Sequence, residues 1–150
     1  MKNWPEDTVL ITFPSVPGFE KIALQGAGEM AVGCGLSQSR VMDLQTALEE
    51  ACINAMEHGN SYISGKPVSV IIKKLPEALQ VDVEDQDSGG WPITINGQPP
   101  SLEDRLEGKC TTRGWGFFIM QKLVDKVELL TGTQHKTIRL IMYFNSTKDQ

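Results

Sequence analysis

A helical pattern in the first half of the chain ends with the sequence EEACINAMEHGN, residues 49–60. On a helical wheel of about 100° per residue, the leucines and alanines of this segment form one apolar stripe, which predicts its buried face. Glu50, Asn54 and His58 follow at four-residue spacing along the margin of that stripe and drift towards it. Unsatisfied polar groups at a core margin cost about 1–3 kcal/mol each. These side chains therefore need partners, which either neighbouring backbone or a functional site can supply.

The composition predicts one globular domain over residues 1–150, long enough to bury a hydrophobic core. A formal net charge of −5 argues against the basic face of a nucleic-acid-binding protein. Three scattered cysteines indicate reduced thiols rather than a disulfide framework or a zinc site. Because no apolar run approaches the roughly 18 residues of a membrane span, we expect a soluble, cytoplasmic protein.

Apolar periodicity predicts four strands and three helices, which form a two-layer α/β (α+β) sandwich with helices on one face of a mostly antiparallel sheet. Ser37 or Ser39 is the expected N-cap of the second helix, and Gly59 follows its end. Residues 89–114 lack periodicity and are rich in Gly and Pro, which predicts a functional loop or lid over about 90–113. The expected strands cover 8–13, 67–75, 78–85 and 136–144, and the expected helices cover 19–35, 36–59 and 115–130.

A carboxylate ends the third predicted strand, in the sequence VDVEDQDSGGW (81–91). Strand alternation places the side chain of Asp85 on the same face as Val81 and Val83. A buried carboxylate needs a hydrogen-bond donor, and Gly89 and Gly90 allow a ligand to approach the backbone. The pattern fits recognition of an exocyclic amine such as that of adenine, and it also fits an ordinary turn.

A second glycine pair stands directly before the last predicted helix, in RGWGFF (113–118). Backbone N–H groups at a helix N-terminus favour phosphate, and Arg113 adds a cation beside Gly114 and Gly116. The pair alone fits a lid hinge equally well.

In this order, the three segments and the long lid resemble the N, G1 and G2 boxes of the GHKL (Bergerat-fold) ATPases. The pattern is most similar to the small anti-sigma-factor serine kinases of the RsbW/SpoIIAB type. EEACINAMEHGN resembles their N box, and GWGFFIMQKLVDKVEL (114–129) resembles the G2 box and the helix after it. The resemblance covers nearly the whole chain. It implies the Bergerat fold, a histidine-kinase-like ATPase domain, and the use of ATP with Mg²⁺.

The resemblance also implies a function, namely an ATP-dependent serine-protein kinase that acts as an anti-sigma factor in a partner-switching circuit. Glu50 would be the general base that takes the proton from a serine on a partner protein. Asn54 would coordinate Mg²⁺ that bridges the ATP phosphates. His58 is left open between packing and a polar role near the phosphates.

The remaining implied contacts belong to the nucleotide. Asp85 would bind the adenine amino group, and Lys21 occupies a position where relatives place a partner-contacting basic residue. The other predicted cofactor-binding residues are Asp87, Gly89, Arg113, Gly114, Trp115, Gly116, Phe117 and Thr137. The implied partners are a STAS-type anti-sigma-factor antagonist and a sigma factor or similar regulator. A homodimer is also implied, with no direct contact to nucleic acid or membrane.

One departure from the family pattern leaves alternatives open. Asp87 stands where the family's Asp-x-Gly-x-Gly sequence has its first glycine, so either Asp85 or Asp87 is the adenine-binding carboxylate. A second hypothesis is an ATP-binding module that sequesters or activates a partner without phosphoryl transfer. A stressosome-type switch that activates a phosphatase is a third hypothesis, which the intact pattern from Glu50 to Gly59 disfavours.

Overall fold

The computed structural model describes residues 7–86, 115–132 and 135–146. Within these ranges, a single five-stranded sheet has the order β1-β2-β3-β5-β4. Every neighbouring pair is antiparallel. The strands are β1 (Thr8–Phe13), β2 (Val68–Lys74), β3 (Ala78–Glu84), β4 (Lys126–Thr131) and β5 (Lys136–Tyr143).

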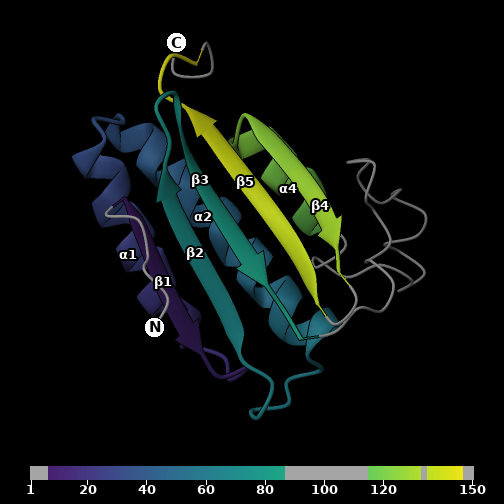
Figure 1. Ribbon diagram of the computed structural model, residues 1–150. Helices are drawn as coiled ribbons and strands as arrows, with labels where there is room; N and C mark the ends of the chain where they lie inside the picture. The colour runs from purple at the N-terminus through teal and green to yellow at the C-terminus, as the bar shows by residue number, and fades with distance from the viewer. Residues whose placement is uncertain (1–6, 87–114, 133–134, 147–150) are drawn as a thin grey trace.

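The helices cover one face of this sheet (Figure 1). They are α1 (Glu20–Gly33), α2 (Gln38–Asn54), the π-helical turn η1 (Ala55–Gly59) and α4 (Gly116–Leu123). A continuous hydrophobic core unites buried residues of the helices with those of the sheet. The predicted two-layer α+β sandwich is therefore confirmed.

Helix α2 follows its sequence pattern closely. Ser37 has an extended backbone, and its hydroxyl accepts a hydrogen bond from the Arg40 backbone N–H (3.3 Å). This identifies Ser37 as the N-cap among the two candidates. The predicted apolar stripe is fully buried, at Leu44, Ala47, Leu48 and Ala51.

The end of this helix differs from the prediction of one helix over 36–59. After Asn54 the chain widens into η1, where the Asn60 N–H donates to the Ala55 carbonyl (2.9 Å) across five residues. This wider turn changes the angular step between side chains. The expected inward drift of His58 is therefore wrong, because its side chain is exposed.

The prediction of one helix over 115–130 is also wrong in its second half. Helix α4 ends before Asp125, and the chain continues as β4 along β5. The Asp125 N–H donates to the Ile141 carbonyl (3.0 Å), and its carboxylate accepts from Arg40 Nη2 (2.7 Å). The short apolar run after Asp125 fits the residue spacing of a helix and that of a strand. It forms a strand because it pairs with the edge of β5.

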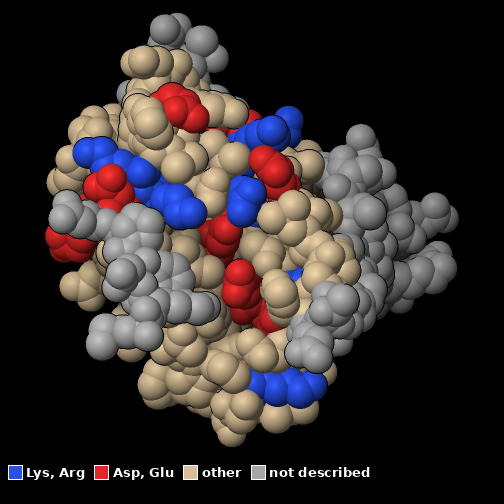
Figure 2. Space-filling view, viewed as in Figure 1, with Lys and Arg blue, Asp and Glu red and all other residues tan. Residues whose placement is uncertain are grey.

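The face of the sheet away from the helices carries both signs of charge, as Figure 2 shows. Asp82 of β3 and Arg139 of β5 form a bidentate pair across it, with N–O distances of 2.9 and 3.0 Å. The hydrogen bond to Asp82 raises the pKa of Arg139 above its ordinary value. Basic and acidic side chains are interspersed on this face rather than gathered by sign.

Candidate functional site

The carboxylate of Asp85 lies at the end of β3 and is only 5% exposed. Its Oδ1 accepts from the Lys136 backbone N–H (3.2 Å), and the Asp85 N–H donates to the Lys136 carbonyl (3.0 Å). The Lys136 ammonium stands 4.0 Å from Oδ2. The burial of Asp85 predicted from strand alternation is thus confirmed, with Lys136 on the adjacent strand as its neighbour.

Asp85 also lies directly against the end of the N-box helix. A Cβ atom on Gly59 would stand 2.1 Å from Asp85 Oδ2 and 2.7 Å from its Cβ. Real side chains do not approach this closely, so the position accepts only glycine unless Asp85 moves. The end of the segment 49–60 therefore meets the described part of the segment 81–91, residues 81–86, at this pair.

A second glycine contact joins the N box to the last helix. A Cβ atom on Gly116, the first residue of α4, would stand 3.0 Å from Glu50 Oε2. The N-terminus of α4, where N–H groups and the helix dipole favour anions, thus begins beside the Glu50 carboxylate. The structure brings Glu50 and Gly116 together, as the sequence motifs suggest.

Asn54 is buried one turn after Glu50. Residues four apart in a helix lie one above the other, so both side chains project from the same side of α2. An amide oxygen is a suitable ligand for Mg²⁺ when phosphate oxygens and water complete the shell. Over the residues described, no group of three or more His, Cys, Asp or Glu side chains is arranged to hold a metal ion.

Asn60 is a positioning residue that the sequence reasoning missed. It is completely buried at 0% exposure. Its Nδ2 donates to Ser15 Oγ (2.9 Å) and to the carbonyls of Lys66 (2.8 Å) and Pro67 (3.1 Å), and its Oδ1 accepts from the Gln86 N–H (2.8 Å). The asparagine directly after His-Gly was the available signal. Asn60 fixes the chain immediately after Asp85.

The other predicted site residues have different positions. Thr137 is buried on β5 opposite Glu84, one residue along from the Asp85–Lys136 pair. Phe117 belongs to the hydrophobic core, and Trp115 packs edge-on against Phe118 with ring centroids 5.7 Å apart. Their contacts to a nucleotide stay predictions. The predicted lid and four predicted residues lie outside the described part of the chain, namely Asp87, Gly89, Arg113 and Gly114.

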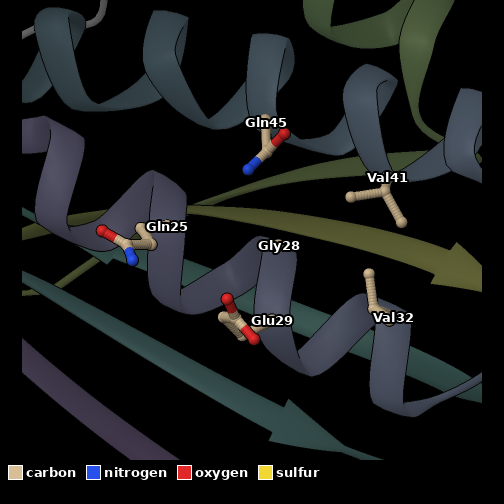
Figure 3. A pocket seen from close by; sticks show the side chains of 6 residues that line it. All are labelled: Gln25, Gly28, Glu29, Val32, Val41 and Gln45. Carbon is tan, nitrogen blue, oxygen red and sulfur yellow. The ribbon is translucent and has the colours of Figure 1, made fainter.

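A hollow of about 360 Å³ lies between α1 and α2 (Figure 3). Its lining combines three polar side chains with small and branched apolar residues. Gln45 reaches across it, and its Nε2 donates to the Leu24 carbonyl (3.0 Å). No predicted site residue is among the residues that line it, which are Gln25, Gly28, Glu29, Val32, Val41 and Gln45.

The fold and these contacts agree with a family comparison. The model of the histidine kinase-like ATPase domain matches residues 17–142. The chain therefore belongs to the histidine kinase-like ATPase family, and the sequence-based resemblance to GHKL proteins of the anti-sigma-factor kinase type is confirmed. Membership of this family implies the use of ATP.

Within that family, the chain is similar to the serine-protein kinases RsbW. It is 24% identical to RsbW of Bacillus velezensis over 143 residues, covering 95% of this chain and 89% of the relative. It is 24% identical to RsbW of Bacillus subtilis over 149 residues, covering 99% and 92% of the two chains. The similarity thus extends along almost the full length of both proteins.

Two solved structures share the fold. A Mycobacterium tuberculosis protein with RsbU and RsbW domains superposes with a TM-score of 0.63 at 18% identity, covering 92% of this chain and 32% of that one. A chain of the SiaB–SiaC complex of Pseudomonas aeruginosa superposes with a TM-score of 0.62 at 13% identity, covering 89% and 88%. Among the described helices, none combines the length and the apolar character that a membrane-spanning helix needs.

Proposed function

We propose that this protein is an ATP-dependent serine-protein kinase and anti-sigma factor of a partner-switching circuit. Its substrate is a serine on a STAS-type anti-sigma-factor antagonist. One observation carries the proposal: Gly59 lies against Asp85, and Gly116 lies against Glu50. Helix α2 thus contacts the N-terminus of α4, which would bind phosphate, and the turn η1 that ends it contacts Asp85, which would bind the base. Similarity to the RsbW kinases supports the same function.

Asp85 defines the adenine end of the site. As an ionised carboxylate it is an acceptor only, so it can receive a hydrogen bond from the adenine amino group. Its burial makes that contact selective, because a base with an acceptor at this position would be repelled by the buried negative charge. Thr137 lies opposite Glu84 on the neighbouring strand, so alternation places its side chain on the other face of the sheet from Asp85, and it is not counted as a base contact in this proposal.

Glu50 defines the reacting end. It accepts the proton of the serine hydroxyl while the serine oxygen bonds to the γ-phosphorus and the bond to the ADP oxygen breaks. A positioned base contributes about 10²–10⁴-fold to such a reaction. The N–H groups at the start of α4 bind phosphate oxygens, since the helix terminus favours negative charge.

Asn54 is the residue that holds Mg²⁺ in this proposal. The chemistry that Mg²⁺ would supply there is neutralisation of negative charge on the phosphates during transfer. One amide ligand is too little for a metal site made of protein alone, so Asn54 would hold the ion only together with ligands from the nucleotide and water. Gly114 and Arg113 extend the phosphate contacts, and His58 adds polarity at the helix end.

The partners follow from the same proposal. The protein sequesters a sigma factor or a similar regulator, acts in the cytoplasm and forms a homodimer. Lys21 on α1 is exposed and contributes to the partner surface.

The decisive experiment is a pull-down with the full chain in Mg-ADP and in Mg-ATP, followed by phosphosite mapping on the retained proteins. We expect a small antagonist that is phosphorylated on one serine in Mg-ATP. The matched variant Glu50→Ala should retain the antagonist and bind ADP normally, yet transfer no phosphate. Absence of phosphoserine on a genuine partner would overturn the kinase proposal.

A second candidate is a module that binds ATP to set its conformation and holds a partner without phosphoryl transfer. Asp87 favours it, because this residue replaces the first glycine of the G1 turn. The two candidates differ in their response to Glu50→Ala. The variant eliminates the output of a kinase, whereas the partner-holding of a binding module does not change.

A further inference from the structure

A buried lysine stands beside the proposed adenine-binding carboxylate. Lys136 begins β5 and is only 2% exposed. Lysine is almost never buried to this extent unless its charge is paired. Its ammonium nitrogen stands 4.0 Å from Asp85 Oδ2, and the two residues are held in register by two further hydrogen bonds through the Lys136 backbone. The sheet therefore fixes the backbone of Lys136 beside the Asp85 carboxylate, and burial of the side chain keeps its ammonium close to that carboxylate.

These two groups form a donor and an acceptor at a defined spacing. An ionised carboxylate only accepts, and a lysine ammonium only donates. Their separation of 4.0 Å exceeds the 2.7–3.2 Å of a direct N–H···O bond. The pair can therefore address two adjacent atoms of one planar ligand, with the acceptor facing a donor and the donor facing an acceptor.

The edge of adenine has this order of groups. Its exocyclic amine donates, and the ring nitrogen N1 beside it accepts. Guanine carries the opposite order, since its O6 accepts and its N1–H donates. In the same orientation, guanine would place an acceptor against Asp85 and a donor against Lys136. Both contacts would be repulsive, and buried polar groups that lose their partners discriminate strongly between substrates.

We propose that Lys136 is a base-reading residue, whose ammonium donates to adenine N1 while Asp85 accepts from the adenine amine. This inference rests on the proposed function, because it assumes that adenine nucleotide binds at Asp85. It adds a specificity-determining residue on β5 to the carboxylate on β3. The buried charge of Lys136 thus has a role in the bound state and a partner in the free state.

The experiment replaces the N1 acceptor of the nucleotide and, separately, the ammonium group of Lys136. ADP, 1-deaza-ADP (with C–H in place of N1) and GDP are titrated calorimetrically into the wild type, Lys136→Met and the control Lys126→Met. Lys126 begins the adjacent strand β4 and is exposed. In the wild type and the control, we expect 1-deaza-ADP to bind about tenfold more weakly than ADP, the size of one charged hydrogen bond.

Lys136→Met should bind ADP about tenfold more weakly and bind 1-deaza-ADP as well as ADP. Its preference for ADP over GDP should also fall. The inference is overturned if Lys136→Met keeps the wild-type sensitivity to 1-deaza-ADP. It is equally overturned if the wild type binds 1-deaza-ADP as tightly as ADP, a comparison that stands even if the variant does not fold. Absence of any ADP binding by the wild type would instead contradict the proposed function itself.

Discussion

Asp85 Oδ2 leaves no room for a side chain at position 59. A Cβ atom on Gly59 would stand only 2.1 Å from this oxygen. The end of the second helix and the end of the third strand are therefore fitted to each other. This contact orients the Asp85 carboxylate, because the carboxylate cannot rotate towards the Gly59 backbone without collision. The geometry of the proposed adenine-binding end of the site thus depends on Gly59, a residue that need not touch the nucleotide.

Gly59→Ala should displace Asp85 and weaken ADP binding by about tenfold or more, the size of a lost hydrogen bond to a charged group. Calorimetric titration measures the change. Gly33→Ala is the matched control, because no atom lies within 4 Å of the place of a Cβ at Gly33. Equal ADP affinity in both variants would contradict the positioning role of Gly59.

Gly116→Ala should affect transfer more than binding. The new methyl group would stand 3.0 Å from Glu50 Oε2, so the carboxylate must shift by a few tenths of an ångström. Because small displacements of a reacting group reduce rates strongly, we expect the rate of serine phosphorylation to fall about tenfold or more while ADP affinity changes little. Gly65→Ala, which has open space around it, is the control. A loss of ADP affinity as large as the loss of rate would contradict this separation.

Arg40 and Asp125 form a buried ion pair, at 2% and 8% side-chain exposure, that ties the start of α2 to the junction of α4 and β4. Removing one partner leaves a buried charge, which typically costs about 3–5 kcal/mol. Arg40→Met should therefore lower the free energy of unfolding by about 3 kcal/mol in urea titrations. Lys126→Met, which breaks an exposed pair with Glu128, should change it by less than about 1 kcal/mol. Similar effects of both variants would contradict the account.

This ion pair should also be lost in acid. Burial alone would raise the pKa of Asp125, but hydrogen bonds from Ser146 and the Tyr143 N–H, with the contact to Arg40, hold that pKa below its ordinary value. A lowered pKa in the folded state gives stabilisation that is complete above the unfolded value of about 3.9 and is lost as the pH falls through the folded value. The difference in unfolding free energy between wild type and Asp125→Asn should thus shrink below about pH 4. A difference independent of pH down to acid unfolding would contradict this assignment.

Cys52 should be unreactive in the folded protein. Burial, with smaller contributions from the charges of Glu20 and Glu49, raises the pKa of its thiol well above the ordinary value. Each pKa unit lowers the thiolate fraction about tenfold near neutral pH. A variant that keeps only Cys52 should react with a disulfide reagent more than about a hundredfold more slowly than one that keeps only the half-buried Cys34. Comparable rates would show that the core around Cys52 opens readily.

Local patterns in the sequence predicted several parts of this site. The apolar stripe of α2 depends on neighbours within one or two turns, and so does its N-cap, for which the sequence offered Ser37 and Ser39 and the structure selects Ser37. The burial of Asp85 follows from alternation along its own strand. Glu50, Asp85 and the pair Gly114 and Gly116 were expected to share one site, because their segments resemble the motifs of one family, but the contacts with Gly59 and Gly116 were not themselves predicted.

Other features depend on interactions between distant segments and could not be read from local patterns. The strand β4 forms because β5 offers an edge, although its sequence also fits a helix. The π-helical turn that exposes His58 leaves no periodic signal in a short segment. Lys136 neighbours Asp85 only through the register between β3 and β5. Asn60 likewise bonds to four residues from three separate segments of the chain.

The central claim is that Asp85 binds the adenine of ATP, and titration of Mg-ATP into three variants tests it most directly. Asp82→Asn is the matched control, because Asp82 lies on the same strand but pairs with Arg139 on the other face of the sheet. We predict that the wild type and Asp82→Asn bind Mg-ATP alike and that Asp85→Asn binds at least about tenfold more weakly. If Asp87→Asn abolishes binding while Asp85→Asn retains it, the carboxylate has been misassigned. Full Mg-ATP affinity in Asp85→Asn would contradict the account.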